Sequence, residues 1–578
     1  MVMVTPEPGR SLVLPRPASL MLELKTEPFR NRLSSLLSQR SFYDEEMREI
    51  GEFVRPRRGR FIGQRTAGAQ QRNRLSDKII NTTATIASRT LKSGMQSGVS
   101  SPARPWFRLT TPDPDLAESG EVKDYLTTVA RRMGAIFSKS NIYNSLHTAY
   151  GDLGDFGTSL MMIDEDFHDV IRCHVRPPGS YCLAMDARGS IGTAYVEFTM
   201  SVLACVEKWG KRVSDGVMRM YDSGVYDTMV DIVEAVEPNM QQVKGIPGPR
   251  GAPYIRVWFE KSGDAKNLLD CRPCHEFPAC APRWEIIEES EVYGYGPGLE
   301  ALGDAKSIQM MEVRKAILID KLATPPTQGG SSQVKVNHRA GSHTFTPDQA
   351  SAAGGKVIHP LYEMTGQGLQ AVAAEIQTVE ARINKAYFYD LFLALTQSDR
   401  REITAREVDE RHEEKLLALG PVLERLHNEN LDPAIARTFA VMHRAGLLPD
   451  PPKQLIETDL RVQFISTLAQ AQRAVGINGI ENMARFVGGL VQVFPGVVDK
   501  FDADQAVDEY ADAQGVPPGV ILSDDKVAKI REDKAKAAQG EAAMAGTAQV
   551  ANLGKTLAET EITDQSALGQ VLGGVGAY

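Results

Sequence analysis

The sequence predicts an α+β fold divided into several domains. The chain has 578 residues, which is enough for more than one domain and for a large buried core. Residues 159–290 contain short runs rich in β-formers separated by turn residues, whereas the segments on either side carry apolar residues at helical spacing. Because strands and helices occupy separate stretches of the chain, the pattern favours α+β over alternating α/β.

The composition is that of an ordinary soluble protein, with 42% hydrophobic and 24% charged residues. The formal net charge of −9 argues against a protein that grips nucleic acid over its whole surface, but not against one that lets nucleic acid pass. A basic band from Arg55 to Arg74 is expected to be a solvated arm; the alternative is contact with phosphates or with an acidic neighbouring subunit.

No apolar run reaches membrane-spanning length, and the N-terminal stretch lacks the pattern of an export signal. Six cysteines do not make a disulfide framework in so long a chain, so we expect reduced thiols and synthesis in the cytoplasm.

Three helices are predicted ahead of the β-rich stretch. Apolar residues recur at helical spacing over 27–51, from 77 to about 95, and over 115–139. The second of these helices is expected to end where Gly94 and Gly98 are followed by two prolines.

The β-rich stretch is predicted to be a layer of strands with little helix. One helix, SVLACVEKWGK from Ser201, interrupts it. The runs with the strand pattern are SLMMIDED from Ser159, DVIRCHV from Asp169, SYCLAMD from Ser180, TAYVEFTM from Thr193, VDIVEAVEP from Val230 and YIRVWFE from Tyr254.

The centre of the chain predicts two long helices around a small insert. The first helix covers 297–322, and the paired prolines in ATPPTQGGSS stop it because they cannot continue the hydrogen-bond ladder. The insert, 325–365, contains short strand patterns, and the second helix runs from about 368 to 395. Thr404 and Glu407 form a capping box, which predicts the start of a third long helix.

The stretch CRPCHEFPAC places Cys271, Cys274, His275 and Cys280 within ten residues. These residue types bind zinc, and the first three have the spacing used to attach a c-type haem. Haem attachment requires export, for which the sequence shows no signal, and structural zinc sites usually join two separated ligand pairs. The sequence therefore favours a cluster without metal, with a zinc site as the alternative.

The remaining motifs indicate no catalytic residues and no cofactor. The acidic loop DEDFHD contains Asp164 and Asp166, but it lacks the glycine and the terminal glutamate of a calcium loop. LGKT around Lys555 lacks the upstream glycine of a phosphate-binding loop. The alternative is a metal-dependent nucleic-acid enzyme that uses this acidic loop or the cysteine cluster.

Five motifs follow one another along the chain: GMQSGVSSPARPWFRL from Gly94, FGTSLMMIDED from Phe156, FPACAPRWEIIEESEVYGYGPGLEALGD from Phe277, ITAREVDERHEEKLLALGPVLERL from Ile403 and GLLPDPP from Gly446. In combination they resemble the head-to-tail connector family, the portal proteins of short-tailed bacteriophages. The resemblance spans roughly residues 27–455. A tail or scaffold protein is a further alternative, and it would lack the helix–insert–helix centre.

The resemblance implies a portal fold with a β-rich wing, long stem helices around a central channel, a small α/β clip and a helical crown. It implies a ring of this chain, expected to have twelve subunits, at one capsid vertex of the virion, assembled in the host cytoplasm. Double-stranded DNA would pass through the ring during packaging and ejection. The further partners implied are the packaging terminase ATPase, a tail adaptor protein, and the major capsid and scaffold proteins. No enzymatic activity and no membrane contact are implied.

Mapped onto this chain, the resemblance also predicts domain boundaries. The cysteine cluster falls in the wing, where the family requires no metal. The segments are a flexible lead (1–26), the wing (27–296), the first stem helix (297–324), the clip (325–365), the second stem helix (366–395), the channel loop (396–403), long wing and crown helices (404–452), the crown (453–535) and an Ala/Gly-rich tail (536–578).

Two sets of residues are expected to matter in such a ring. Cations that could contact passing phosphates are Arg400 and Arg401 in the channel loop, and Arg314, Lys315 and Lys321 on the first stem helix. Each could instead form a salt bridge, because Asp399, Glu402 and Glu312 lie nearby in sequence. The expected anchors of the core or of a subunit interface are Trp106, Phe107, Arg283 and Trp284.

Overall fold

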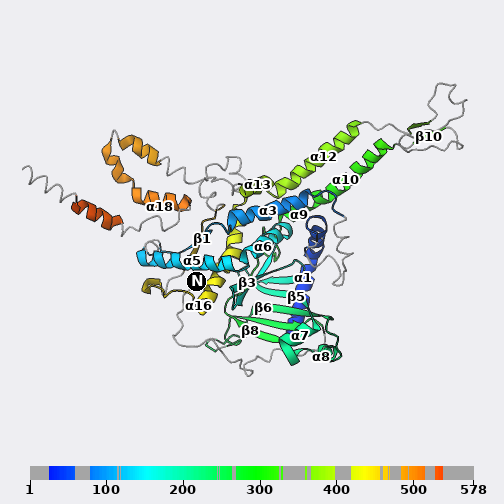
Figure 1. The fold of residues 1–578 in the computed structure, drawn as a ribbon, viewed down its shortest axis with the longest axis horizontal. Coiled ribbons are helices and arrows are strands. Elements are labelled where there is room, and N and C mark those ends of the chain that lie inside the picture. Colours follow the sequence, from blue (N-terminus) through cyan, green and yellow to red (C-terminus); the bar gives the residue numbers. More distant parts are fainter. Residues whose placement is uncertain are drawn as a thin grey trace, which may run out of the picture.

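The computed structural model describes residues 25–56, 58, 78–113, 116, 119–243, 245–246, 248–262, 268–324, 327–329, 358–360, 366–397, 418–455, 460–466, 468, 483–491, 494–514 and 527–537. Over these residues the fold is α+β, as predicted, with helices and antiparallel sheets in separate layers (Figure 1). None of the helices in these ranges is long and apolar enough to cross a membrane.

Helices form the first part of the fold, and three of the four lie in the predicted segments. The helix α6 was not indicated by the sequence, because Gly151 and Gly154 are poor helix formers. The second helix ends in the predicted stretch, at Val99 directly after Gly98, although α3 continues past Gly94. The bounds are Thr26–Phe53 (α1), Thr83–Val99 (α3), Gly120–Lys139 (α5) and Ile142–Phe156 (α6).

A five-stranded antiparallel sheet forms the second layer, in the order β4-β5-β6-β7-β8. One face packs on α1, for example on Leu33, and the opposite face packs on α7 and α8, for example on Cys205. Side chains alternate across a strand, so the neighbours Val257 and Trp258 belong to these two different layers. The bounds are Tyr181–Met185 (β4), Ile191–Ser201 (β5), Val202–Trp209 (α7), Asp215–Asp222 (α8), Met229–Pro238 (β6), Tyr254–Glu260 (β7) and Asp270–Cys274 (β8).

Two smaller sheets connect segments that are distant in the sequence. The first has the order β3-β2-β9, and the second pairs β1 with β12, joining Phe107 to Phe464. The second pairing was not predicted, because neither strand shows where its partner lies. The bounds are Phe107–Thr110 (β1), Leu160–Asp166 (β2), Val170–Arg176 (β3), Ala279–Cys280 (β9) and Arg461–Phe464 (β12).

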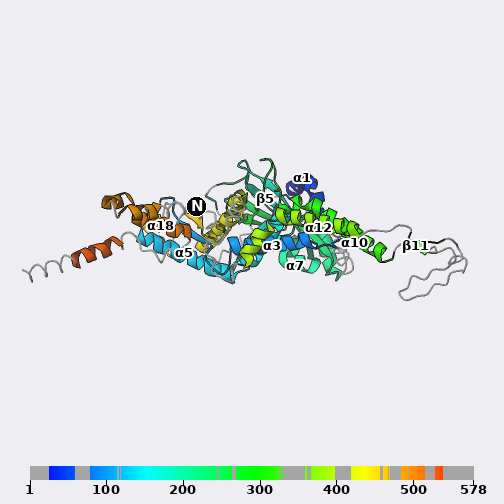
Figure 2. The ribbon, with the colours of Figure 1, turned by 90° about the horizontal axis from the view of Figure 1, so that it is seen from above.

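Two long helices project from this body in both views (Figures 1 and 2). The first predicted segment forms α9 (Pro297–Glu300) and α10 (Leu302–Ala323). The second forms α12 (Gly366–Ala386) and α13 (Tyr389–Gln397). The prediction of one continuous helix is wrong there, because Phe388 has a φ of 52° and interrupts the helical geometry.

Further along the chain, α15 (Gly420–Leu426), a π-helical turn η4 (His427–Leu431) and α16 (Asp432–Arg444) follow one another directly. The last named elements are 3-10 turns at Lys453–Leu455 and Pro495–Lys500 and the helix α18 (Ala503–Gln514).

Some predictions fall outside the described residues. These are the capping box at Thr404 and Glu407, most of the insert, and most of the C-terminal tail. Of the insert, the structure describes β10 (Thr327–Gly329) and β11 (Ile358–Pro360), which pair with each other.

Candidate functional site

The helices α10 and α12 lie side by side and form the candidate site (Figures 1 and 2). On α12, Ile376, Val379 and Ile383 are buried at helical spacing. Arg382 of α12 forms an ion pair with Asp304 of α10, with 2.8 Å between Nη2 and Oδ1. The buried stripe and this ion pair hold the two helices together where they leave the body.

A second set of contacts attaches both helices to the turn before α3. Gln309 Oε1 accepts a hydrogen bond from the backbone N–H of Asn81 at 2.8 Å, and Gln309 Nε2 donates to the Asn81 carbonyl at 2.9 Å. Asn81 Nδ2 donates to Glu312 of α10 at 3.2 Å and to Glu380 of α12 at 3.0 Å. One asparagine therefore contacts both long helices.

The junction between α12 and α13 is held by a buried carboxylate. Asp155 accepts hydrogen bonds from Tyr387 Oη at 3.2 Å, from Ser88 Oγ at 2.8 Å and from Arg55 Nη1 at 3.2 Å. Burial raises the pKa of Asp155, and the nearby guanidinium of Arg55 opposes this rise. The left-handed residue Phe388 directly follows Tyr387, so the break in the helix is anchored to the body on its N-terminal side.

Two members of the basic band also bind buried carboxylates. Asp152 is fully buried and accepts hydrogen bonds from Arg55 Nη1 at 3.0 Å and from Arg58 Nε at 2.9 Å. The expectation of a solvated arm is therefore wrong for Arg55 and Arg58, because their charges neutralise Asp152 inside the fold. Residues 57 and 59–74 of the band lie outside the described part of the chain.

Gly94, the first residue of the first motif of the resemblance, lies at a close contact between two helices. A Cβ at this position would lie 2.4 Å from the Cβ of Phe392 on α13, and Phe392 is buried. Glycine therefore allows α13 to pack directly against α3.

A second close approach joins two other motifs of the resemblance. Gly157 has a φ of 73°, and a Cβ there would lie 2.0 Å from the carbonyl oxygen of Gly294. Gly294 donates its N–H to Thr158 Oγ1 at 2.7 Å. A Cβ at Gly298 would lie 2.1 Å from the carbonyl oxygen of Asp155. The segment leading into α9 and α10 thus crosses the end of α6 backbone against backbone.

The four expected anchors are all buried within one copy of the chain. Trp106 and Phe107 belong to the main core, with 4.7 Å between their ring centroids. The backbone N–H of Trp284 donates to the carbonyl of Gly157 at 2.9 Å. Arg283 has a side chain that is 4% exposed, and its Nη2 lies 2.6 Å from Glu429 Oε1 in η4.

The expected phosphate-contacting cations have different environments. Lys315 is paired with Glu312 one turn earlier on α10, with 2.6 Å between Nζ and Oε2. Arg314 and Lys321 are exposed on the same helix and form no ion pair with any residue that the structure describes. Arg400 and Arg401 lie outside the described residues.

The cysteine cluster is divided between two sheets. Cys271 and Cys274 lie on β8 of the five-stranded sheet, whereas Cys280 lies on β9 of the three-stranded sheet. Burial raises the pKa of Cys271 to about 11 and also raises the pKa of Cys274 and Cys280, which disfavours the thiolate form that binds metals. Within the described ranges no group of His, Cys, Asp or Glu side chains is arranged to hold a metal ion.

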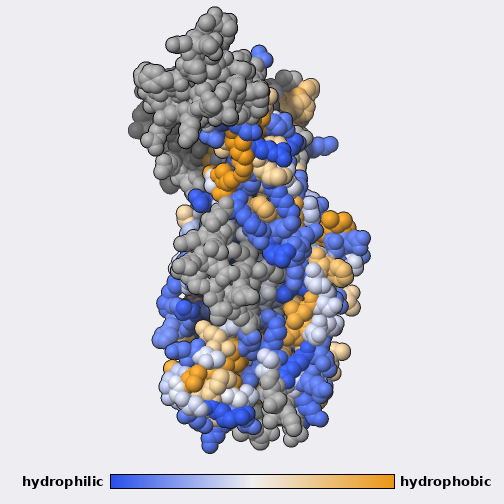
Figure 3. Space-filling model, turned by 90° about the vertical axis from the view of Figure 1, so that its right-hand side faces the viewer, coloured by the Kyte–Doolittle hydropathy of each residue, from blue (hydrophilic) through white to orange (hydrophobic). Residues whose placement is uncertain are grey.

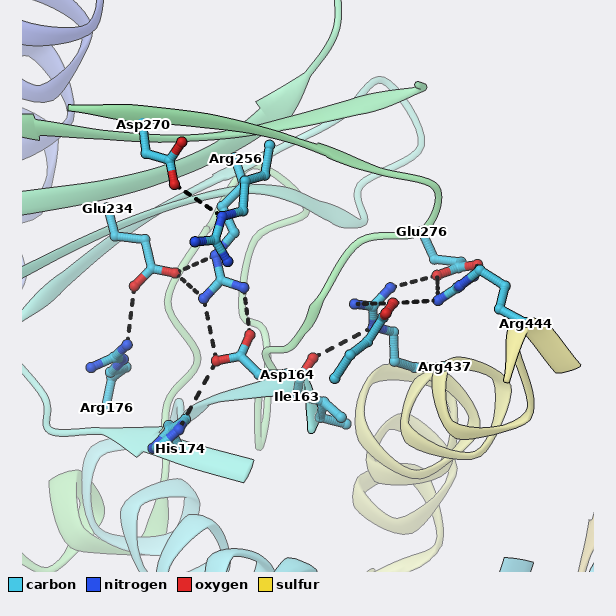
Figure 4. A network of polar contacts seen from close by, with 12 residues as sticks. Ile163, Asp164, His174, Arg176, Glu234, Arg256, Asp270, Glu276, Arg437 and Arg444 are labelled. Atoms are coloured by element: carbon cyan, nitrogen blue, oxygen red, sulfur yellow. Dashed lines mark hydrogen bonds and ion pairs between the residues drawn. The ribbon is translucent and has the colours of Figure 1, made fainter. Parts of the chain in front are cut away.

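The acidic loop takes part in a network of ion pairs between layers (Figure 4). Asp164 of β2 binds Arg256 of β7, which also binds Glu234 of β6, and Arg176 Nη2 lies 3.1 Å from Glu234 Oε2. Burial is the largest single influence on Asp164, and by itself it would raise the pKa of this carboxyl. The contacts with Arg256, followed by the charges of His174 and Arg176, together outweigh burial, so the pKa of Asp164 is lowered. Asp164 thus joins the two sheets.

The same figure shows a second group, in which Arg437 and Arg444 of α16 both bind Glu276 (Figure 4). Asp166, the other acidic residue considered for a metal, accepts a hydrogen bond from the backbone N–H of His168 at 2.8 Å in the hairpin turn. Both carboxylates of the acidic loop therefore have structural partners.

The outer part of α10 exposes apolar side chains. Gln309 is the last buried residue of this helix, and beyond it the exposed fraction is 59% at Met310 and 48% at Ile317. The other exposed apolar residues of α10 are Val313, Ile319 and Leu322. In Figure 3, which faces the right-hand side of Figure 1, hydrophobic surface lies in separate patches among hydrophilic side chains.

Sequence reasoning did not identify the residues that attach the long helices to the body. Asp155 lies between Gly154 and Phe156 near the end of α6, and a carboxylate between such residues is a signal for a buried polar contact. Asn81 stands two residues before the first residue of α3, a region where asparagine often caps a helix. Neither signal identifies the residue that is bound: Asp155 binds Tyr387, and Asn81 binds Glu380 on α12.

Comparisons with known proteins agree with the motifs. A family model described as bacteriophage head to tail connecting protein matches residues 27–522, which extends beyond the span of the resemblance. The chain is 40% identical over 560 residues to the portal protein of Salmonella phage epsilon15, covering 96% of this chain and 100% of that protein. It is 38% identical over 552 residues to the probable portal protein of Bordetella phage BPP-1, covering 95% of this chain and 98% of that protein.

Proposed function

This chain belongs to the bacteriophage head to tail connecting protein family and functions as a portal protein, and from that premise we propose how its elements build the portal. Portal proteins are structural proteins that form a ring at a capsid vertex and connect the head to the tail. We propose that the ring has twelve subunits, that it assembles in the host cytoplasm, and that double-stranded DNA passes through it.

In the proposed ring α10 and α12 are the stem helices that surround the channel. The observation that supports this assignment is the exposed apolar surface on the outer part of α10. Met310, Ile317 and their exposed neighbours on α10 would lie against water in an isolated copy, which is unfavourable by about 25 cal/mol for each Å². Packing against the stem helices of the neighbouring copies removes this surface from water.

The remaining segments take the positions that their place in the chain suggests. The body up to residue 296 is the wing, the insert 325–365 is the clip, and residues 453–535 form the crown. We propose that the clip contacts the packaging terminase ATPase and later a tail adaptor protein, and that the crown and wing contact the scaffold and major capsid proteins.

The passage of DNA requires that the channel does not hold its phosphates tightly. A duplex carries one charge for each ~1.7 Å of its axis, so a strongly basic channel would bind it in a salt-dependent way. The subunit is acidic overall, with a formal net charge of −9. Arg314 and Lys321 are exposed on α10, and we propose that they make transient phosphate contacts.

Electron microscopy of the purified full-length protein tests this function. The expected result is a ring with a central hole. Ile317→Asp puts a charge into the proposed stem interface and should shift the population from rings to smaller species. Val243→Asp changes a similarly exposed apolar residue in the loop after β6 and should leave the rings intact. Single copies at high concentration in the wild type, or intact rings with Ile317→Asp, would contradict the stem assignment.

A further inference from the structure

Local groups of opposite charge lie on the two sides of the five-stranded sheet, carboxylates on the outside of α1 and cations beside α7, and this arrangement indicates how neighbouring copies fit together. The helix α1 covers one face, and α7 covers the other. Figure 2 shows α1 and α7 on opposite sides of the molecule. A surface on the outside of α1 and a surface beside α7 therefore point away from each other, as two contact surfaces of a closed ring must.

The surface beside α7 is a basic patch that lies over two buried indole rings. Lys208 Nζ lies 4.7 Å from the ring centroid of Trp209 and 5.9 Å from that of Trp258. The guanidinium of Arg272 lies 5.1 Å from the ring centroid of Trp258. Burial against the rings, together with the nearby charges of Arg272 and Arg256, lowers the pKa of Lys208.

This basic patch is open to partners. Lys208 is exposed, and the side chains of Arg272 and Arg212 are 57% and 44% exposed. Asp270 lies between the two arginines, 3.0 Å from Arg272 and 3.5 Å from Arg212, so a single carboxylate is shared by both. Positive charge is therefore available above the buried indole rings of Trp209 and Trp258, and such a patch suits an acidic protein surface.

The outside of α1 carries several carboxylates and one large exposed apolar residue. Glu45 is paired with Arg48 of the same helix, and Glu49 is paired with Lys306 of α10. Phe42, Glu45, Glu46 and Glu49 lie at i, i+3, i+4 and i+7, which places them on one face of the helix. This face is opposite to the residues such as Leu33 that pack on the sheet. The side chain of Phe42 is 83% exposed.

A second acidic segment lies next to this face of α1. The ring of Tyr43 on α1 contacts that of Tyr293 at a tilt of 49°, with 5.0 Å between the centroids, which brings the loop before Tyr293 to the helix. Burial, followed by the carboxylates of Glu291, Glu46 and Glu288, raises the pKa of Tyr43. Carboxylates from the helix and from the loop are thus close enough to act on one phenol.

We propose that the acidic face of α1, around Phe42 and Glu46, docks on the basic patch around Lys208 and Trp258 of the next copy in the ring. This inference rests on the proposed function, because it assumes the ring. It adds which surfaces of two neighbouring wings contact each other. A second copy is favoured over DNA because the chain itself carries a group of carboxylates on the opposite side of the same sheet, on the outside of α1.

Zero-length carbodiimide crosslinking of assembled full-length protein tests the contact. Rings are assembled from equal amounts of ¹⁴N-labelled and ¹⁵N-labelled copies and crosslinked peptides are identified by mass spectrometry. The expected product joins Lys208 to Glu45 or Glu46, in mixed-isotope pairs that prove contact between copies. Crosslinks of Lys208 to carboxylates elsewhere, in rings that assemble normally, would overturn the inference and leave the portal function standing. Failure of the wild type to form rings would instead refute the proposed function.

Charge reversal gives an independent test with a matched control. Lys208→Glu and Glu46→Lys each place like charges opposite one another, and each should raise the concentration needed for assembly about tenfold or more. The double variant should restore assembly, which a mere folding defect in either single variant would not allow. Lys139→Glu, at an exposed lysine on α5, should have no effect. If Lys208→Glu leaves assembly unchanged but reduces retention of double-stranded DNA by the ring, the patch contacts nucleic acid and the inference is wrong.

Discussion

Replacing Gly94 by alanine tests whether the contact between α3 and α13 determines the stability of the body. The added Cβ would lie 2.4 Å from the Cβ of Phe392, well inside the 3.0 Å below which such contacts essentially do not occur. No change of side-chain rotamer moves the Cβ of Phe392, so one helix must shift. Overpacking of a core costs about 1–3 kcal/mol, and an alanine in a helix gains about 1 kcal/mol over glycine.

Because the clash involves atoms next to both backbones, we expect the upper part of the overpacking range. The net loss in the free energy of unfolding is then about 2 kcal/mol. Gly134→Ala is the matched control: Gly134 also lies inside a helix, α5, and an added Cβ would have no atom within 4 Å. This control should stabilise the protein by up to about 1 kcal/mol.

The assay is urea unfolding of dissociated subunits, followed by tryptophan fluorescence. Trp106 and Trp284 report on the relevant region, since both belong to the main core that also contains Phe392. The reasoning would be refuted if Gly94→Ala stabilised the subunit as much as Gly134→Ala, because the close approach would then not exist in solution.

Three further changes have defined outcomes. Arg283→Met leaves the Glu429 carboxylate without its guanidinium and should cost about 3–5 kcal/mol in urea unfolding; a loss below 1 kcal/mol would contradict the pairing. Asn81→Ala removes a donor from Glu380 and should cost about 1–3 kcal/mol, with faster hydrogen exchange at the base of α10; unchanged exchange there would argue against this attachment. Burial raises the pKa of Asp432 from 3.8 to about 6, so the folded state binds its proton more tightly than the unfolded state. Stability should therefore fall as the pH rises from about 4 to about 6, and Asp432→Asn should abolish this fall; an equal fall in the variant would assign it to another group.

The candidate site could be predicted from the sequence only in its local features. The helical spacing around Ile317 and Ile383 places both long helices, because apolar periodicity reflects the local backbone geometry. The break at Phe388 could not be predicted, since phenylalanine has no local preference for a left-handed backbone. The break exists beside Tyr387, whose hydroxyl binds Asp155 on a helix far away in the sequence.

The glycines illustrate the same limit. In the sequence, Gly94 indicates the end of a helix, because glycine is a poor helix former. In the structure, α3 continues through this residue, since the missing side chain makes room for Phe392. A local rule was overridden by packing against a helix that lies almost three hundred residues later.

The sequence by itself determined the α+β class, the places of most helices and strands, and the family, because these depend on local periodicity and on motifs in a fixed order. Only the tertiary structure decided how the pieces meet. It paired β1 with β12, separated Cys271 from Cys280 onto different sheets, and bound Asp164 to Arg256. The physical reason is that such contacts depend on burial and charge between segments distant in sequence, and no local pattern specifies the partner.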